Sequence, residues 1–175
     1  LVRRYCLKLG LVWQGLTHDL SKYSPTEFWR GCKYYQGWRS PNDQERLENG
    51  VSLAWLHHKG RNKHHYEYWI DYSMQALPGG MAPVPMPDRY IAEMIMDRIA
   101  ASKVYMGDKY TDRSPLDYYY RGTDKAPIHP KTKAKLLYVL EMLAEQGEEK
   151  TFQFIKEELV QHKRCMDWHQ LEKAE

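Results

Sequence analysis

The stretch "DRYIAEMIMDRIAASKVY", residues 88–105, decides the fold class because its apolar side chains recur at helical intervals. One stripe is formed by Ile91, Met94, Ile95 and Ile99. This spacing predicts a long helix that buries one face. Arg98 lies near the middle of the stripe, an unusual place for a solvated charge.

The segments on either side also predict helices and no strand. Helical patterns cover residues 2–16, 25–36, 44–58, 64–74, 131–147 and 149–162. Residues 77–87 are too rich in Pro and Gly for anything but a connector, and residues 107–130 are rich in turns. We therefore predict an all-α fold of one helical bundle. Residues 1–125 would form its core, and residues 126–175 a C-terminal helical hairpin packed on that core.

Helix ends are marked most clearly around "SPTE", residues 24–27. Ser24 is the predicted N-cap, Pro25 suits the first helical position, and Glu27 is placed to reach back in a capping box. Gly60 is the predicted C-cap of the helix before it. Gly147 is expected to separate the two helices of the hairpin.

Length and composition narrow the function classes. A chain of 175 residues suits one domain, and the mild net charge of +3 without a Lys/Arg run makes nucleic acid an unlikely partner. No apolar run approaches the roughly 20 residues that span a bilayer, and no signal-peptide pattern is visible. We expect a cytoplasmic protein without membrane contact, in which Cys6, Cys32 and Cys165 are buried free thiols. The sequence leaves open whether the protein forms homo-oligomers.

Five of the eight histidines lie in "HDLSK", residues 18–22, and "HHKGRNKHH", residues 57–65. Neighbours in mid-helix point about 100° apart, but at a helix end His18 and Asp19 can converge. A histidine with a carboxylate is a mixed N/O ligand set for Zn, Mn, Fe or Co. The alternative is a surface pair or a capped turn.

The second stretch places four imidazoles around one turn. His57 and His58 close a predicted helix, and His64 and His65 open the next. Ligands often lie at such rigid helix ends. A solvated basic corner is the alternative, but it leaves the acidic partners unexplained.

The acidic partners lie on the helix at residues 88–105, where Glu93 and Asp97 share a face. Asp97 should be at least partly buried, because Tyr90, Ala101 and Val104 border it. A buried carboxylate needs a hydrogen-bonded, cationic or metal partner. A salt bridge to an arginine is the alternative to a metal.

These residues together predict a site for one or two divalent ions. The expected ligands are His18, Asp19, His57, His58, His64, His65 and Asp97, with Asp19 able to bridge two ions. Mn, Fe, Co, Zn or Mg would suit such a set. Lys22, three residues after Asp19, would contact a phosphate oxygen of the substrate.

The same residues resemble the HD superfamily of metal-dependent phosphohydrolases. More closely, "LTHDLSKYSPTEF", "AWLHHKGRNKHHYEYW" and "MPDRYIAEMIMDRIAASKVY" are similar to a family of uncharacterised bacterial and phage proteins, the domain of unknown function DUF5662. The resemblance covers most of the chain. It implies an HD-domain-like core in residues 1–125.

The wider superfamily implies roles residue by residue. Its His-Asp doublet matches His18 and Asp19, its closing Asp matches Asp97, and its intermediate histidines match one member of each pair. Lys22 matches the lysine after the doublet in cyclic-dinucleotide phosphodiesterases. The chain departs in three ways. The GYP signature of those enzymes is absent. Lys22 replaces the Glu of some nucleotidases. The superfamily's upstream His is not within residues 1–17, so it either precedes Leu1 or does not belong to this site.

We therefore predict a divalent-metal-dependent phosphohydrolase acting on a phosphomonoester or a nucleotide-like phosphate ester. Asp19 and Lys22 would be catalytic, and the expected substrate contacts are Lys22, Arg61, Asn62, Tyr66 and Arg98. The alternative is a non-catalytic helical module with a structural metal or polar His cluster that acts as an interaction protein.

Overall fold

The helix predicted from the opening stretch runs through the centre of the molecule as α6, Asp88–Met106. The structure is a computed structural model that describes residues 1–74, 78–122, 126–163 and 168. Ile91, Ile95 and Ile99 are fully buried, as the apolar stripe predicts. Ala92 and Met96 are buried too, so helices pack around α6 on more than one side.

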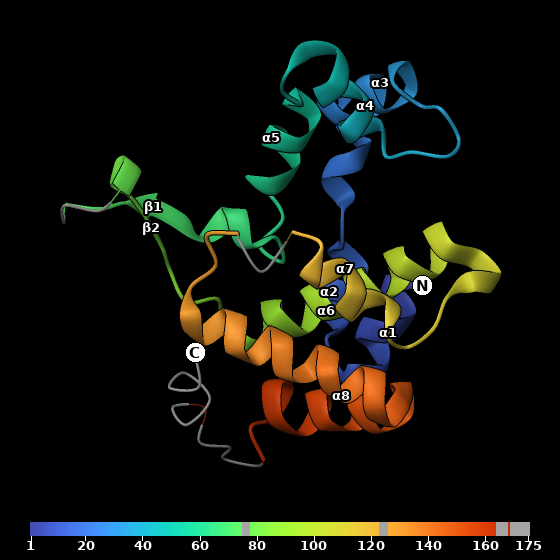
Figure 1. Cartoon of the computed structure of the whole chain (residues 1–175), viewed down its shortest axis with the longest axis vertical. Coiled ribbons are helices and arrows are strands. Elements are labelled where there is room, and N and C mark those ends of the chain that lie inside the picture. Colours follow the sequence, from blue (N-terminus) through green and yellow to red (C-terminus); the bar gives the residue numbers. More distant parts are fainter. Residues whose placement is uncertain (75–77, 123–125, 164–167, 169–175) are drawn as a thin grey trace.

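Three helices, α1 (Val2–Leu9), α7 (Ser114–Tyr120) and α8 (Pro130–Ile155), pack against α6, and a fourth, α2 (Val12–Thr17), packs against α1 (Figure 1). One helix over residues 2–16 was expected, but Gly10, with φ of 85°, ends α1 and separates it from α2. A further difference is α7, a helix within the stretch that was expected to be rich in turns.

A close approach at Gly15 fixes α2 against α1. A Cβ atom at this position would lie 3.0 Å from Cys6 Cβ and 3.2 Å from the Arg3 carbonyl oxygen. Only glycine allows this contact without displacing its neighbours. The contact sets the direction in which α2 delivers His18 and Asp19 to the interior.

The C-terminal segment turns back on itself at Gly147, within α8 (Figure 1). Gly147 has φ of 78° and ψ of 173°, so the expected break between two helical arms is confirmed. The second arm continues as a π-helical turn, η6, over Lys156–Val160. Leu136, Leu140 and Ile155 join the same apolar core as α6. Residues 164–167 and 169–175 of the predicted hairpin, Cys165 among them, lie outside the described residues.

A separate lobe stands above this body and contains α3 (Pro25–Lys33), α4 (Pro41–Asn49) and α5 (Leu53–Lys59) (Figure 1). The single helix expected over residues 44–58 is two helices, because α4 ends at Gly50 and Ser52 caps α5. Cys32 is exposed here, whereas we expected a buried thiol; Cys6 in the body is buried as expected.

The centre of the lobe is polar. Glu45 is almost fully buried and accepts hydrogen bonds from Arg30 Nη1 (2.5 Å), Ser52 Oγ (2.6 Å) and the backbone N–H of Ala54 (3.3 Å). Asn49 Nδ2 donates to Tyr34 Oη at 2.9 Å. Charge-assisted hydrogen bonds therefore hold the three lobe helices together where the body uses apolar packing.

A short two-stranded sheet follows the lobe and corrects the expectation of an unbroken helix over residues 64–74. The chain forms one 3₁₀ turn, η2 (Tyr66–Trp69), and then β1 (Ile70–Tyr72), which pairs antiparallel with β2 (Met81–Pro83). A further 3₁₀ turn, η3 (Pro78–Gly80), precedes β2. The expected connector over residues 77–87 therefore contains a strand. Its first residue, Leu77, lies outside the described residues.

The fold is predominantly helical, so the all-α prediction is confirmed apart from this small sheet. The described residues also include two short 3₁₀ turns, η1 (Leu20–Tyr23) between α2 and α3 and η4 (Gly107–Lys109) after α6. Within the described residues, no helix is long and apolar enough to cross a membrane.

Candidate metal centre

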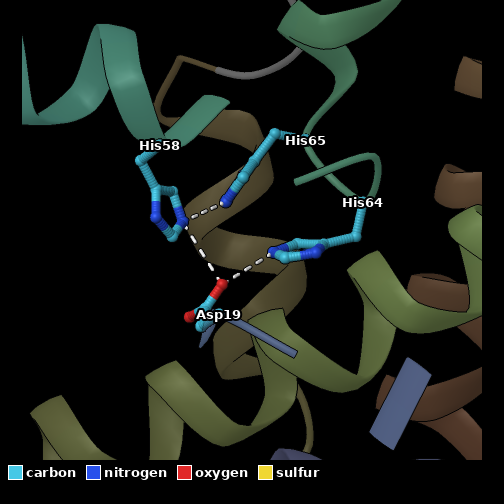
Figure 2. Close-up of side chains that lie close together, drawn as sticks. All are labelled: Asp19, His58, His64 and His65. Atoms are coloured by element: carbon cyan, nitrogen blue, oxygen red, sulfur yellow. Dashed lines mark hydrogen bonds and ion pairs between the residues drawn. The ribbon is translucent and has the colours of Figure 1, made fainter. Parts of the chain in front are cut away.

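A polar cluster lies where the lobe meets the body. The α2–η1 junction supplies His18 and Asp19, and α6 supplies Glu93 and Asp97. The end of α5 and the turn after it supply His58, His64 and His65, whose rings point toward Asp19 (Figure 2). Segments far apart in the sequence thus converge on one carboxylate.

The backbone at Asp19 explains how adjacent residues meet. Asp19 has φ of 57° and ψ of 21°, the left-handed region that non-glycine residues seldom adopt. This sharp turn directly after α2 brings His18 Nε2 within 3.3 Å of Asp19 Oδ2. The expectation that a helix end would let the two side chains converge is confirmed. Such strained positions cluster at functional sites.

Two imidazoles approach the other oxygen of Asp19. His58 Nε2 lies 3.3 Å and His64 Nε2 3.4 Å from Asp19 Oδ1, and His65 Nε2 lies 2.9 Å from His58 Nε2. The second histidine pair was expected to open a helix. It instead occupies an irregular turn, which lets adjacent residues point inward together.

His57 takes another direction from its neighbour. Its Nδ1 donates to Glu27 Oε1 at 2.6 Å, away from Asp19. His57 belongs to neither group of convergent ligand atoms among the described residues. Adjacent positions on a helix diverge, so α5 can aim only one histidine of this pair at Asp19.

Two glutamates hold the far sides of the inward rings. Glu27 Oε2 accepts from His58 Nδ1 at 2.8 Å, and Glu93 Oε1 accepts from His18 Nδ1 at 3.0 Å. Glu93 Oε1 also lies 3.1 Å from His64 Nδ1. Metal-binding histidines characteristically donate their second N–H to a carboxylate in this way, which aims the other nitrogen at the ion.

Glu27 was not predicted to belong to the site, and Glu93 was named only as an acidic partner of the histidines, without a ligand or supporting role. Ser24 Oγ caps α3 by accepting from the Glu27 N–H at 3.4 Å, but the Glu27 side chain faces the histidines and does not close a capping box. The available signal for Glu93 was its position one turn before Asp97 on the same helix face.

The electrostatics of the cluster favour a cation. Burial alone would lower the pKa of His18, but contacts with Asp19, Asp97 and Glu93 raise it to about 11. Burial alone would raise the pKa of Asp19, but His18, His58 and Lys22 hold that pKa far below its usual value. The carboxylates therefore stabilise a positive charge within this buried cluster.

His65 differs from the other inward histidines. Burial, together with the neighbouring His64 and His58, lowers its pKa to about 2. The ring is therefore neutral at ordinary pH and keeps a lone pair for a metal.

The donor atoms fit a metal by number, type and spacing. The first ligand group contains Asp19, His58, His64 and His65, and the second contains His18, His64 and Asp97; within each group the ligand atoms lie within 4.8 Å of one another. Asp19 Oδ1 and His64 Nε2 are buried and make no hydrogen bond within the described part of the chain. Buried ligand atoms that make no hydrogen bond suit an ion bound between imidazole and carboxylate groups.

The cluster is closed on one side and open on the other. The side chains of His58 and His64 are 5% and 2% exposed, whereas those of Asp97 and Lys22 are 29% and 63% exposed. Solvent therefore reaches the second ligand group more easily than the first. The expected partial burial of Asp97 is confirmed, and His18 Nε2 lies 3.5 Å from its carboxylate.

The sequence of this chain matches one family model, a family of unknown function named DUF5662, over residues 1–142. The chain belongs to the DUF5662 family. The matched region of this DUF5662 protein contains every residue of the cluster. No curated protein and no solved structure matches the chain.

The predicted substrate residues of the DUF5662 chain have different surroundings. Lys22 Nζ lies 2.6 Å from Asp19 Oδ2 at the open side. Asn62 is buried and donates to Ser21 Oγ at 2.7 Å and to the His58 carbonyl oxygen at 2.8 Å, so it fixes the turn beside the cluster. Arg61 is exposed and donates to the His57 carbonyl oxygen.

Tyr66 and Arg98 influence each other's charge, and Asp97 also acts on Arg98. Burial lowers the pKa of Arg98, against the opposing influence of Tyr118, Tyr66 and Asp97. Burial, with Glu67 nearby, raises the pKa of Tyr66 to about 12. Both side chains are partly buried. Their predicted contact with substrate stays a prediction.

Proposed function

We propose that this protein is a divalent-metal-dependent phosphohydrolase that acts on a phosphomonoester or a nucleotide-like phosphate ester. The observation that carries the proposal is the convergence of His58 Nε2 and His64 Nε2 on Asp19 Oδ1, with a glutamate behind each ring. Mixed imidazole and carboxylate ligands are typical of metal sites that hydrolyse phosphate esters. The resemblance of the His-Asp doublet to the HD superfamily supports the same reading.

One or two ions, of Mn, Fe, Co, Zn or Mg, fit the two ligand groups. Asp19 belongs to the first ligand group and would be shared between ions if a second one bound near His18, because its two oxygens face different histidines. A divalent ion at such a site activates water and polarises a phosphoryl oxygen.

Lys22 adds a positive charge on the solvent-accessible side. Its ammonium group lies against Asp19 and is mostly exposed, so it can turn to a phosphate oxygen that enters beside Asp97. A lysine acts there as a point charge that offsets the negative charge developing in the transition state. Asp19 and Lys22 are the catalytic residues of the proposal.

The test combines elemental analysis with hydrolysis of a generic ester such as p-nitrophenyl phosphate in the presence of Mn²⁺ or Co²⁺. Protein purified without chelators should carry a divalent metal and hydrolyse the ester. Asp19→Asn should lower hydrolysis by more than about 100-fold, because the amide lacks the anionic oxygen of the carboxylate. Asn is the suitable replacement because it tolerates the left-handed backbone at this position.

Asp43→Asn is the matched control, since Asp43 is an exposed carboxylate on α4 that pairs with Arg46. This variant should keep wild-type metal content and activity. A folded Asp19→Asn protein with wild-type metal affinity would refute the ligand assignment.

A structural metal is the second candidate, because His58 and His64 are almost inaccessible. In that case the protein is a non-catalytic helical module that acts as an interaction protein. A closed ligand shell distinguishes it from an enzyme. Added inorganic phosphate would then leave the visible spectrum of the Co²⁺-loaded protein unchanged, whereas an open position would shift that spectrum.

A further inference from the structure

Glu93 is a buried carboxylate of the cluster that contacts a histidine on each side of Asp19. Its Oε1 atom lies 3.0 Å from His18 Nδ1 and 3.1 Å from His64 Nδ1. Glu93 is buried within α6, the central helix of the body. A buried carboxylate is stable there because it accepts hydrogen bonds from both rings.

The two contacts fix which nitrogen of each ring faces the ligand site. With Nδ1 turned to Glu93, His18 presents Nε2 to Asp19 and Asp97, and His64 presents Nε2 to Asp19. His64 belongs to both ligand groups, and His18 belongs to the second. One oxygen atom therefore orients a ligand in whichever group an ion occupies.

Glu27 differs from Glu93 in the ligand groups that its histidine partners belong to. It holds His58, which belongs to the first ligand group alone, and its other oxygen binds His57, which belongs to neither. The two glutamates are equally buried and both contact imidazoles, but they serve different numbers of ligand groups.

We infer that Glu93 is a shared positioning residue that sets the ligand geometry of both groups through His18 and His64, whereas Glu27 serves only the first group. This inference rests on the metal centre of the proposed function and not on the reaction assigned to it. Carboxylates behind ligating histidines change metal affinity by about 10- to 100-fold. Loss of Glu93 should therefore weaken the binding of every ion in the cluster.

The experiment is a Co²⁺ titration of the full chain, followed by the visible d–d spectrum and by calorimetry. Glu93→Ala should weaken each Co²⁺-binding step by about 100-fold and alter the spectrum of each loaded form. Glu93→Gln should weaken each step by about 10-fold, because the amide oxygen still accepts hydrogen bonds but carries no charge. This graded pair keeps the test valid if the alanine variant fails to fold.

Glu27→Gln is the matched control. It should change only the binding step that involves His58 and leave the second ligand group unaffected. Glu93 variants that melt earlier but bind Co²⁺ with wild-type affinity and spectrum would show a purely structural role and overturn the inference. Equal effects of the Glu93 and Glu27 variants on every step would also overturn it.

The outcomes separate this inference from the proposed function. A wild-type protein that binds no Co²⁺ overturns both. A wild-type protein that binds Co²⁺, loses affinity in the Glu93 variants and hydrolyses no phosphate ester overturns the proposed reaction and supports the positioning role.

Discussion

His57 and His58 are neighbours in the sequence but have different surroundings, and this difference can be tested directly. His58 Nε2 faces Asp19, whereas His57 contacts Glu27 and belongs to neither ligand group of the described residues. We predict that His58→Ala lowers divalent-metal affinity by more than about 100-fold and that His57→Ala changes it by less than about threefold. Calorimetric titration with Mn²⁺ or Co²⁺ measures both.

The two variants control for each other, because both remove an imidazole from α5 and both release one oxygen of Glu27. Equal losses in the two variants would mean that Glu27 alone controls affinity. A larger loss in His57→Ala would contradict the orientation of α5 described above.

The sequence indicates the residue types of the centre better than its geometry. The residues with convergent ligand atoms, His18, Asp19, His58, His64, His65 and Asp97, were all candidates from the sequence. The pattern did not distinguish His57 from His58, because that choice depends on the rotation of α5 against η1. Glu27 was missed as a support, because a helix start gave it a simpler explanation, and Glu93 was named as an acidic partner without its role behind particular rings.

At the scale of elements, Gly147 determines how the C-terminal arms fold back. Its φ of 78° and ψ of 173° lie in a region that is essentially restricted to glycine, and a Cβ there would lie 3.4 Å from Asp112 Oδ2. We predict that Gly147→Ala lowers the free energy of unfolding by about 1–3 kcal/mol. Urea denaturation followed by circular dichroism measures this change.

Gly31→Ala is the matched control for that prediction. Gly31 lies inside α3, and a Cβ added there meets no atom within 4 Å. Alanine should stabilise this helix by about 0.5–1 kcal/mol. A Gly147→Ala protein as stable as the wild type would show that the break between the arms does not require the left-handed conformation.

The polar centre of the lobe predicts sensitivity to acid. Burial would raise the pKa of Glu45, but hydrogen bonds from Ser52, the Ala54 N–H and Arg30 lower it below the ordinary value of 4.5. A carboxylate with a depressed folded pKa stabilises the protein above its unfolded pKa, and this contribution is lost as the pH falls through the folded value. Glu45→Gln should therefore cost about 2 kcal/mol at pH 7 and progressively less below about pH 4.5.

Denaturation of the wild type and Glu45→Gln between pH 7 and pH 3 measures this difference. Asp43→Asn is a suitable control, because the Asp43–Arg46 pair is exposed and should contribute little at any pH. A destabilisation by Glu45→Gln that stays constant down to pH 3 would contradict the role of the Glu45 charge.

Helices were easier to predict than their interruptions. The apolar stripe of α6 and the break at Gly147 were recognisable, because periodicity and glycine act locally. The division into α4 and α5 was missed, since Leu53, Trp55 and Leu56 continue an apparent helical pattern across Gly50. The pairing of β1 with β2 was missed because it joins residues separated by a loop, and short strands depend on that partner.

At the scale of the whole molecule, the candidate metal centre joins the lobe to the body. The lobe supplies His58 and Glu27, whereas the body supplies His18, Glu93 and Asp97. The body has a continuous apolar core, but the lobe depends on the buried Glu45 network. An ion held by ligands from both parts would therefore add most to the stability of the less apolar part.

Metal removal should consequently loosen the lobe before the body. We predict that EDTA raises amide hydrogen exchange in α3–α5 by about tenfold or more, because opening of the lobe no longer has to break metal–ligand bonds. Exchange in α6 and in the first arm of α8 should change little, since their amides are protected by the apolar core. Peptide-resolved mass spectrometry with and without Mn²⁺ measures both regions. Uniform deprotection of lobe and body would instead mean that the ion stabilises the entire fold as one cooperative unit.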